Sequence, residues 1–166
     1  MSPDGCSGAR ASAPQLPEEW LIRDRADAVV CSQKSARFAE AAGLSHRSAK
    51  QVAIAVSELV TNVIKYAGSG KLVLRRLPGD RAGIEVVVED QGPGIQDPSA
   101  AMEDGFSAGH PSVVELPPSL RTGLGIGLGA VVRLMDSVLI ENLPGAGVRV
   151  TATKHCAVAR SRIASP

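Results

Sequence analysis

Four β-forming runs, arranged as two pairs, constrain the fold of this chain more than any other feature. KLVLRRL and GIEVVVED are separated by PGDRA, and VLIENL and VRVTATK are separated by PGAG. Glycine and proline between such runs are typical turn residues, so each pair predicts a β-hairpin. The run WLIR predicts a further short strand. We therefore expect a mixed, mostly antiparallel sheet.

Two helical segments accompany these strands. Residues 26–42 carry apolar side chains at helical spacing until Gly43 supplies a stop signal. Residues 47–67 follow Ser45, a plausible N-cap, and end at AGSG, whose glycines suit a left-handed helix cap. The apolar stripe of this second helix consists of Val52, Val56, Leu59, Val63 and Tyr66. A stripe of this kind packs on a sheet, so the expected fold class is α+β, a two-layer α/β sandwich with helices on one face.

Length and composition favour a single soluble domain. The chain has 166 residues, 44% of them hydrophobic, which is enough for one hydrophobic core. We expect a disordered N-terminal arm over residues 1–17, one domain over residues 18–154 and a flexible tail over residues 155–166. The arm lacks the apolar segment of a signal peptide, and no later run is long enough to span a bilayer. The expected location is cytoplasmic, without a membrane partner.

Charge, aromatic content and cysteines exclude further classes. The formal net charge is +1 and aromatic residues make up 2% of the chain, so nucleic acid is not an expected partner. Cys6, Cys31 and Cys156 are widely spaced and odd in number, unlike a zinc site or a disulfide framework. His46, His110 and His155 are expected to be ordinary surface residues.

The second helix carries a carboxylate and an amide that can act together. Glu58 and Asn62 are four residues apart, so they lie over one another on one helix face, and Lys65 projects from the same end. A carboxylate can accept a proton from an attacking hydroxyl, and an amide oxygen suits Mg²⁺. Polar residues at this spacing more often form the solvated face of an amphipathic helix, and that alternative is favoured by this stretch alone.

Two glycine-rich segments are candidate parts of a nucleotide site. Asp90 ends an apolar strand, where its carboxylate can accept from an exocyclic amine, and Gly92 and Gly94 let a flat ring lie against backbone. An ordinary Gly-Pro turn is the alternative. Further along, GLGIGLG leads into an amphipathic helix and can expose successive N–H groups to phosphate, or can serve as a hinge loop. The long connection between the two segments suits a lid over nucleotide.

Taken in order, SELVTN, DQGPG and GLGIGLG resemble the N box and the two glycine boxes of the GHKL (Bergerat-fold) ATPases and kinases. The motifs VSELVTNVIKYAGSG, EDQGPGI, MEDGFS and RLMDS resemble a subfamily more closely, the RsbT-like serine/threonine kinases, which are the switch kinases of the bacterial stressosome. That subfamily is related to the anti-sigma-factor kinases, and its substrates are serine or threonine residues of small STAS-domain proteins.

The resemblance implies a role for each matching residue. Glu58 becomes the catalytic base and Asn62 the Mg²⁺ ligand, with ATP as the phosphoryl donor. The implied nucleotide-binding residues are Asn62, Lys65, Tyr66, Asp90, Gly92, Gly94, Ile95, Thr122, Gly123, Leu124, Gly125 and Gly127. Asp90 would accept from the adenine amino group, and the late glycines would line the phosphates. The implied partners are a STAS-domain anti-sigma-factor antagonist as substrate, with a PP2C-type phosphatase or a sigma factor as a further partner.

One position and one segment depart from the family pattern. Two other functions also remain open. Gly147 is followed by Val148, where many relatives have an adenine-binding threonine, and residues 108–122 form a longer lid than that of the switch kinases. One alternative is a nucleotide-gated anti-sigma factor or adaptor that acts by binding. The other is a detached histidine-kinase ATPase domain, which ranks last because no dimerising helix pair with a phosphoacceptor histidine precedes it.

Overall fold

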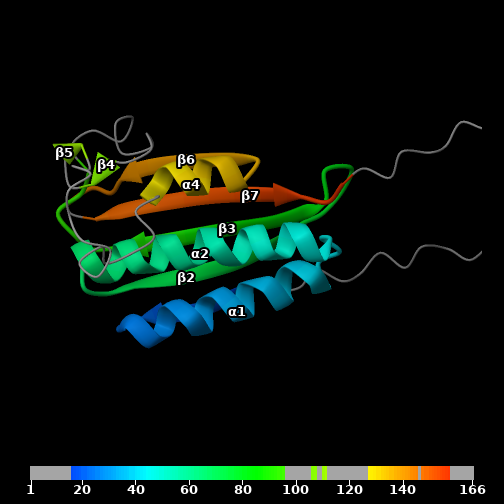
Figure 1. Ribbon diagram of the computed structural model, residues 1–166, viewed down its shortest axis with the longest axis horizontal. Helices are drawn as coiled ribbons and strands as arrows, with labels where there is room; N and C mark the ends of the chain where they lie inside the picture. Colours follow the sequence, from blue (N-terminus) through cyan, green and yellow to red (C-terminus); the bar gives the residue numbers. More distant parts are fainter. Residues whose placement is uncertain (1–15, 96–105, 108–109, 112–126, 146, 158–166) are drawn as a thin grey trace, which may run out of the picture.

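The computed structural model describes residues 16–95, 106–107, 110–111, 127–145 and 147–157. Its elements, drawn in Figure 1, are β1 (Glu18–Ile22), α1 (Arg25–Ala41), α2 (His46–Tyr66), β2 (Gly70–Leu77), β3 (Gly83–Asp90), β4 (Phe106–Ser107), β5 (His110–Pro111), α4 (Gly127–Leu134), β6 (Ser137–Asn142) and β7 (Val148–His155). Both expected hairpins are confirmed, as β2–β3 and β6–β7. The strand expected at residues 20–23 lies two residues earlier at its start, as β1.

The main sheet has five strands in the order β1-β2-β3-β7-β6, and all four pairings among them are antiparallel. The pairing of β3 with β7 joins the two hairpins, with Val87 opposite Thr151 and Glu89 opposite Arg149. This register brings the end of β3 next to the start of β7, so the loop that follows Asp90 lies beside the β6–β7 turn. β4 and β5 form a separate two-stranded sheet.

Helix α1 begins and ends at residues suited to those positions. The Asp24 side chain accepts hydrogen bonds from the N–H groups of Ala26 and Asp27, and the Asp27 side chain accepts from the Asp24 N–H in return. At the other end Gly43 has φ +97°, and the Leu44 N–H donates to the Ala39 carbonyl at 3.0 Å. This is the Schellman arrangement of a glycine-terminated helix, which confirms the stop expected at Gly43.

Helix α2 is the central helix of the layer, and its predicted caps are confirmed. The Ser45 hydroxyl accepts from the Ser48 N–H at 3.2 Å, and Gly68 has φ +79° after the last turn. The Gly68 N–H donates to the Val63 carbonyl at 2.9 Å. At the same end of α2, the Val63 side chain packs on the start of β2, where a Cβ at Gly70 would lie 2.8 Å from it.

The core lies between the sheet and the three helices that the structure describes. Helices α1, α2 and α4 lie together over one face of the sheet (Figure 1), which confirms the expected two-layer α+β sandwich. Four of the five predicted stripe residues of α2 are buried, but Tyr66 is 43% exposed because the buried stripe ends at Val63. The strand side chains that join this core are Ile22, Leu72, Leu74, Ile84, Val86, Val88, Val148, Val150 and Ala152.

The opposite face of the sheet is covered by paired charges. Glu89 lies between Lys71 and Arg149, with N–O distances of 3.1 and 2.6 Å, and Arg75 lies 2.9 Å from Glu85. Burial tends to raise the pKa of Glu89, but its hydrogen bonds and charge contacts with Arg149 and Lys71 outweigh burial and lower that pKa. These ion pairs flank Val87, which is buried although no described helix covers it.

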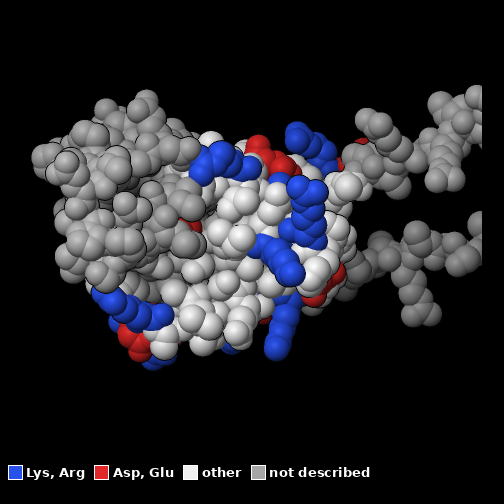
Figure 2. All heavy atoms as spheres, viewed as in Figure 1, with Lys and Arg blue, Asp and Glu red and all other residues white. Residues whose placement is uncertain are grey.

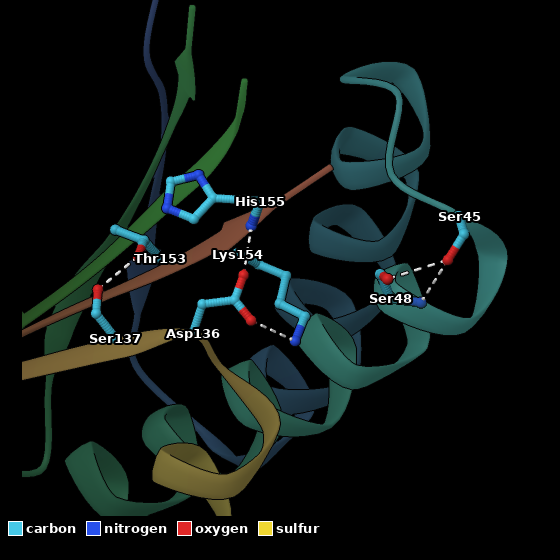
Figure 3. Close-up of polar contacts among 7 residues, drawn as sticks. All are labelled: Ser45, Ser48, Asp136, Ser137, Thr153, Lys154 and His155. Atoms are coloured by element: carbon cyan, nitrogen blue, oxygen red, sulfur yellow. Dashed lines mark hydrogen bonds and ion pairs between the residues drawn. The ribbon is translucent and has the colours of Figure 1, made fainter. Parts of the chain in front are cut away.

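The C-terminal strand continues one residue beyond Lys154, the expected end of the domain. Figure 3 shows the reason: Asp136 accepts from the Lys154 ammonium at 2.9 Å and from the His155 N–H at 2.8 Å. The Cys156 N–H also donates to the Ala82 carbonyl at 2.8 Å. Ordered contacts thus include the first two residues of the expected tail, and residues 158–166 lie outside the described residues.

Charged side chains on the helix side of the molecule are separated by a broad area of neutral residues (Figure 2). Val29, Ile54 and Val132, one from each helix, are exposed apolar side chains. The described part of the chain contains no helix that is both long and apolar enough to cross a membrane.

Candidate functional site

The polar residues of α2 lie in environments that differ along the helix. Glu58 is 7% exposed, Asn62 is half-buried, and Lys65 and Tyr66 at the last turn are exposed. The interpretation of these residues as a solvated helix face is therefore wrong for Glu58, although it holds for Lys65. The Lys65 ammonium lies 4.8 Å from the centroid of the Tyr66 ring, a cation–π distance. Glu58 and Asn62 are one helical turn apart, so they share one face of α2.

Burial gives Glu58 a chemistry that a surface carboxylate lacks. Removal of the side chain from water raises its pKa above the ordinary value of 4.5. A carboxylate with a raised pKa is a stronger base, and a proton acceptor works best when its pKa approaches the working pH. Glu58, the one acidic residue of α2, is therefore suited to accept a proton.

Asp90 lies at the end of β3, half-buried, with its carboxylate held by backbone. Its Oδ1 atom accepts from the Gly92 N–H at 2.8 Å and from the Val148 N–H at 3.2 Å. Both hydrogen bonds go to Oδ1, so backbone N–H groups on two segments hold the carboxylate in one orientation. The first hydrogen bond shapes the turn after β3, and the second ties that turn to β7.

Two glycines let the backbone segments around Asp90 approach closely. A Cβ atom at Gly92 would lie 2.8 Å from Ala67 Cβ, so this glycine allows the turn to pack on the end of α2. Gly147 has φ +107°, and a Cβ there would clash with the Asp90 carbonyl oxygen. The backbone at residue 148 can then reach Asp90. Val148 contacts Asp90 through its N–H, while its apolar side chain joins the core, so the polar side-chain contact that a threonine would make with adenine has no counterpart here.

Asn142, which the sequence analysis did not single out, lies against the loop that follows Asp90. Its Oδ1 accepts from the Ile95 N–H and its Nδ2 donates to the Ile95 carbonyl, each at 2.9 Å. An open hollow of about 280 Å³ borders this contact, lined by Pro93, Gly94, Ile95, Asn142, Leu143, Gly145 and Gly147. The sequence signal was weak because an asparagine shortly before Pro-Gly is typical of a turn.

The end of α2, the end of β3 and the start of β7 lie at the same end of the molecule (Figure 1). The structure thus brings Asn62, Lys65 and Tyr66 of α2 to the end of the fold where Asp90, Gly92, Gly94 and Ile95 follow β3. The contact between Gly92 and Ala67 joins the two groups directly. This end of the fold is the candidate site.

The remaining predicted residues are only partly described. Gly127 is the first residue of α4 and has φ +50°, which confirms a helix after the second glycine segment. Thr122, Gly123, Leu124 and Gly125 lie outside the described residues, as does the expected lid except for His110–Pro111 in β5.

The described histidines have structural contacts. His46 Nδ1 lies 2.6 Å from Glu40, and His155 Nδ1 lies 2.7 Å from the Arg81 carbonyl oxygen. Asp136, beside His155, has a lowered pKa: burial raises it, but hydrogen bonds from the His155 N–H and the Lys154 ammonium outweigh burial. Figure 3 shows this cluster where β7 ends, away from the candidate site. His46 and His155 thus contact residues of their own fold, and His110 lies in β5.

Metal binding at the site would depend on ligands beyond the protein. Among the described residues, no group of three or more His, Cys, Asp or Glu side chains is placed to hold a metal ion. Mg²⁺ commonly takes one or two protein oxygens and completes its shell with phosphate and water. The half-buried amide of Asn62 fits that mode, because it offers one neutral oxygen and leaves the other ligand positions to a nucleotide.

Comparison with known proteins gives two matches. Residues 24–154 match a family model described as a histidine kinase-like ATPase domain. The chain is also 33% identical over 145 residues to the serine/threonine-protein kinase RsbT of Bacillus subtilis (strain 168), and the alignment covers 86% of this chain and 95% of that protein. Both matches extend over the candidate site.

Proposed function

Because the chain belongs to the histidine kinase-like ATPase family, and within it to the RsbT-like kinases, we propose that it is an ATP-dependent serine/threonine protein kinase. Its proposed substrate is a serine or threonine hydroxyl on a STAS-domain protein in a bacterial partner-switching pathway. The family membership supports a kinase of the partner-switching type. The STAS-domain substrate is part of our proposal.

The observation that carries the proposal is the burial of Glu58 one turn before Asn62. A buried carboxylate with a raised pKa can take the proton of an incoming hydroxyl. Asn62 would provide the protein oxygen for Mg²⁺, and Lys65 would supply positive charge near phosphate. Phosphoryl transfer depends on positioning and charge neutralisation, which one carboxylate, one amide and backbone N–H groups can provide.

Asp90 is the residue proposed to bind the adenine ring of the nucleotide. The two backbone hydrogen bonds to Oδ1 hold its carboxylate so that Oδ2 can accept from the adenine amino group. Gly92 and Gly94 add no side chain between backbone and a flat ring. When bound, ATP would supply the γ-phosphoryl group and Mg²⁺ would neutralise charge on the phosphate oxygens.

We expect Asp90→Asn to weaken ATP binding by at least about tenfold, the effect of losing one hydrogen bond to a charged group. Asparagine keeps an oxygen for the Gly92 and Val148 N–H groups but places an NH₂ group where the amine of adenine must be accepted. Calorimetric titration with ADP measures the change. Asp136→Asn, a carboxylate change at the other end of the fold, is the control and leaves ADP affinity unchanged. Equal ADP affinities for Asp90→Asn and the wild type would contradict the assignment.

The proposal is tested by incubating the purified protein with Mg-ATP and STAS-domain proteins of the same genome, followed by intact-mass spectrometry. A kinase adds phosphate to one STAS protein. A partner that binds in an ATP-dependent pull-down and never gains mass would instead indicate the alternative function, a nucleotide-gated anti-sigma factor or adaptor.

A further inference from the structure

We propose that Asn142 is a positioning residue that holds the loop of residues 92–95 in the conformation required for nucleotide binding. The inference rests on the proposed function, because it assigns this loop to the base of the nucleotide. It adds a residue on β6, an edge strand, to a site built from α2 and β3. None of the family motifs quoted above includes this position.

The Asn142 side-chain amide pairs with the backbone of Ile95 through two hydrogen bonds, as a neighbouring strand would. The Asn142 amide accepts from the Ile95 N–H and donates to the Ile95 carbonyl, with both distances 2.9 Å. Only one orientation of the amide satisfies both groups, because its oxygen must face the N–H and its nitrogen the carbonyl. The two residues are 47 positions apart, so the contact links two segments that are otherwise distant in sequence.

The loop is fastened at both of its ends. At the first residue of the loop, the Gly92 N–H donates to Asp90. At the last residue, the Ile95 N–H donates to Asn142. Between them Gly94 has φ +85°, and a Cβ at this position would lie 3.1 Å from Asn142 Oδ1. The close approach of Asn142 thus coincides with a backbone conformation that glycine adopts readily.

Preorganisation explains what the second fastening contributes. A loop that is already ordered does not lose conformational entropy when a ligand binds, whereas a loop freed at Ile95 must be ordered at that moment. Loss of the Asn142 contact should therefore weaken binding of ATP and ADP. It should leave the transfer step unchanged once nucleotide is bound, since Glu58 lies on a different element.

We expect Asn142→Ala to raise the KM for ATP and the Kd for ADP by about three- to tenfold, as for the loss of one or two neutral hydrogen bonds. The kcat should stay within about twofold of wild type, and Asn142→Gln, which keeps the amide, should recover part of the affinity. Ser137→Ala is the matched control. It removes a side-chain contact of the same strand, the hydroxyl pair with Thr153, at the other end of β6 (Figure 3).

Two outcomes would overturn the inference. One is an unchanged Kd for ADP in Asn142→Ala. The other is a lowered melting temperature with reduced kcat and unchanged KM, which is the pattern of a purely structural contact. Amide hydrogen exchange at Ile95 gives a readout independent of nucleotide: the inference requires faster exchange in Asn142→Ala than in Ser137→Ala. A wild-type protein that binds no ADP would refute the proposed function instead, with the exchange measurement still deciding whether Asn142 holds the loop.

Discussion

Glu58→Gln is expected to reduce phosphoryl transfer by about 10²- to 10⁴-fold, the usual contribution of a positioned general base, while ATP binding is retained. Glutamine has nearly the same size and can occupy the same buried position on α2, but it cannot accept a proton. The affinity for ADP should not fall, because the nucleotide base is assigned to the end of β3. The measurement is the rate of phosphate gain by a STAS partner, together with an ADP titration.

The same variant should be more stable than the wild type at neutral pH. Burial raises the pKa of Glu58 above 4.5. Between pH 4.5 and the pKa of the folded state, the folded protein therefore binds more protons than the unfolded chain. Stability linked to this group is fully present below about pH 4.5 and is lost as the pH rises through the folded pKa. Glutamine carries no charge to desolvate, so its stabilising effect appears at neutral pH and disappears in acid.

Glu85→Gln is the control for both measurements. Glu85 lies on the opposite face of the sheet, where it forms an ion pair with Arg75 at 2.9 Å. This variant should transfer phosphate at the wild-type rate and should gain no stability at neutral pH. Transfer by Glu58→Gln at a rate similar to that of Glu85→Gln would refute the role of Glu58 as proton acceptor.

Gly147→Ala is expected to destabilise the fold by about 3 kcal/mol or more and to abolish nucleotide binding. A methyl group at this position would clash with the Asp90 carbonyl oxygen and lie 3.1 Å from Gln91 Cα. The backbone also has φ +107°, which disfavours any side chain. Relief of the clash must move β7 away from Asp90 and break its hydrogen bond with the Val148 N–H.

Gly145→Ala separates the two contributions. Gly145 lies in the same turn and has φ +96°, but a Cβ there meets no atom within 4 Å. Its cost should be limited to the backbone conformation, about 1–2 kcal/mol, with ADP affinity retained. Urea unfolding and ADP titration of both variants provide the comparison. Equal losses of stability in the two variants would mean that the approach of Gly147 to Asp90 is unimportant.

The parts of the fold that could be predicted from sequence are those determined by neighbouring residues. Gly43, Ser45 and Gly68 mark helix ends through their own conformational preferences, and the two hairpins follow from glycine and proline between β-forming runs. The pairing of β3 with β7 has no local signal, because it joins segments about 60 residues apart, such as Glu89 and Arg149. Tyr66 fits the helical period but lies beyond the point where the sheet supports α2.

The sequence could predict which helix or strand carries each candidate residue of α2 and β3, but not the contacts of these residues. Glu58 lies outside the apolar stripe predicted for α2, so its sequence position suggests a solvated residue. Its burial depends on how α2 packs in the finished fold. Asn142 has no signal of its own beyond that of a turn residue. Its contact with Ile95 exists only because β6 and β7 are placed beside the end of β3.

The most direct test of the central claim is the chemical identity of the phosphorylated residue after reaction with Mg-ATP and a STAS partner. Tandem mass spectrometry locates the phosphate, and acid treatment distinguishes a phosphate ester from an acid-labile phosphohistidine. A serine/threonine kinase should leave an acid-stable phosphate on a serine or threonine of the partner. An acid-labile phosphate on the protein itself, with the partner unmodified, would contradict the account.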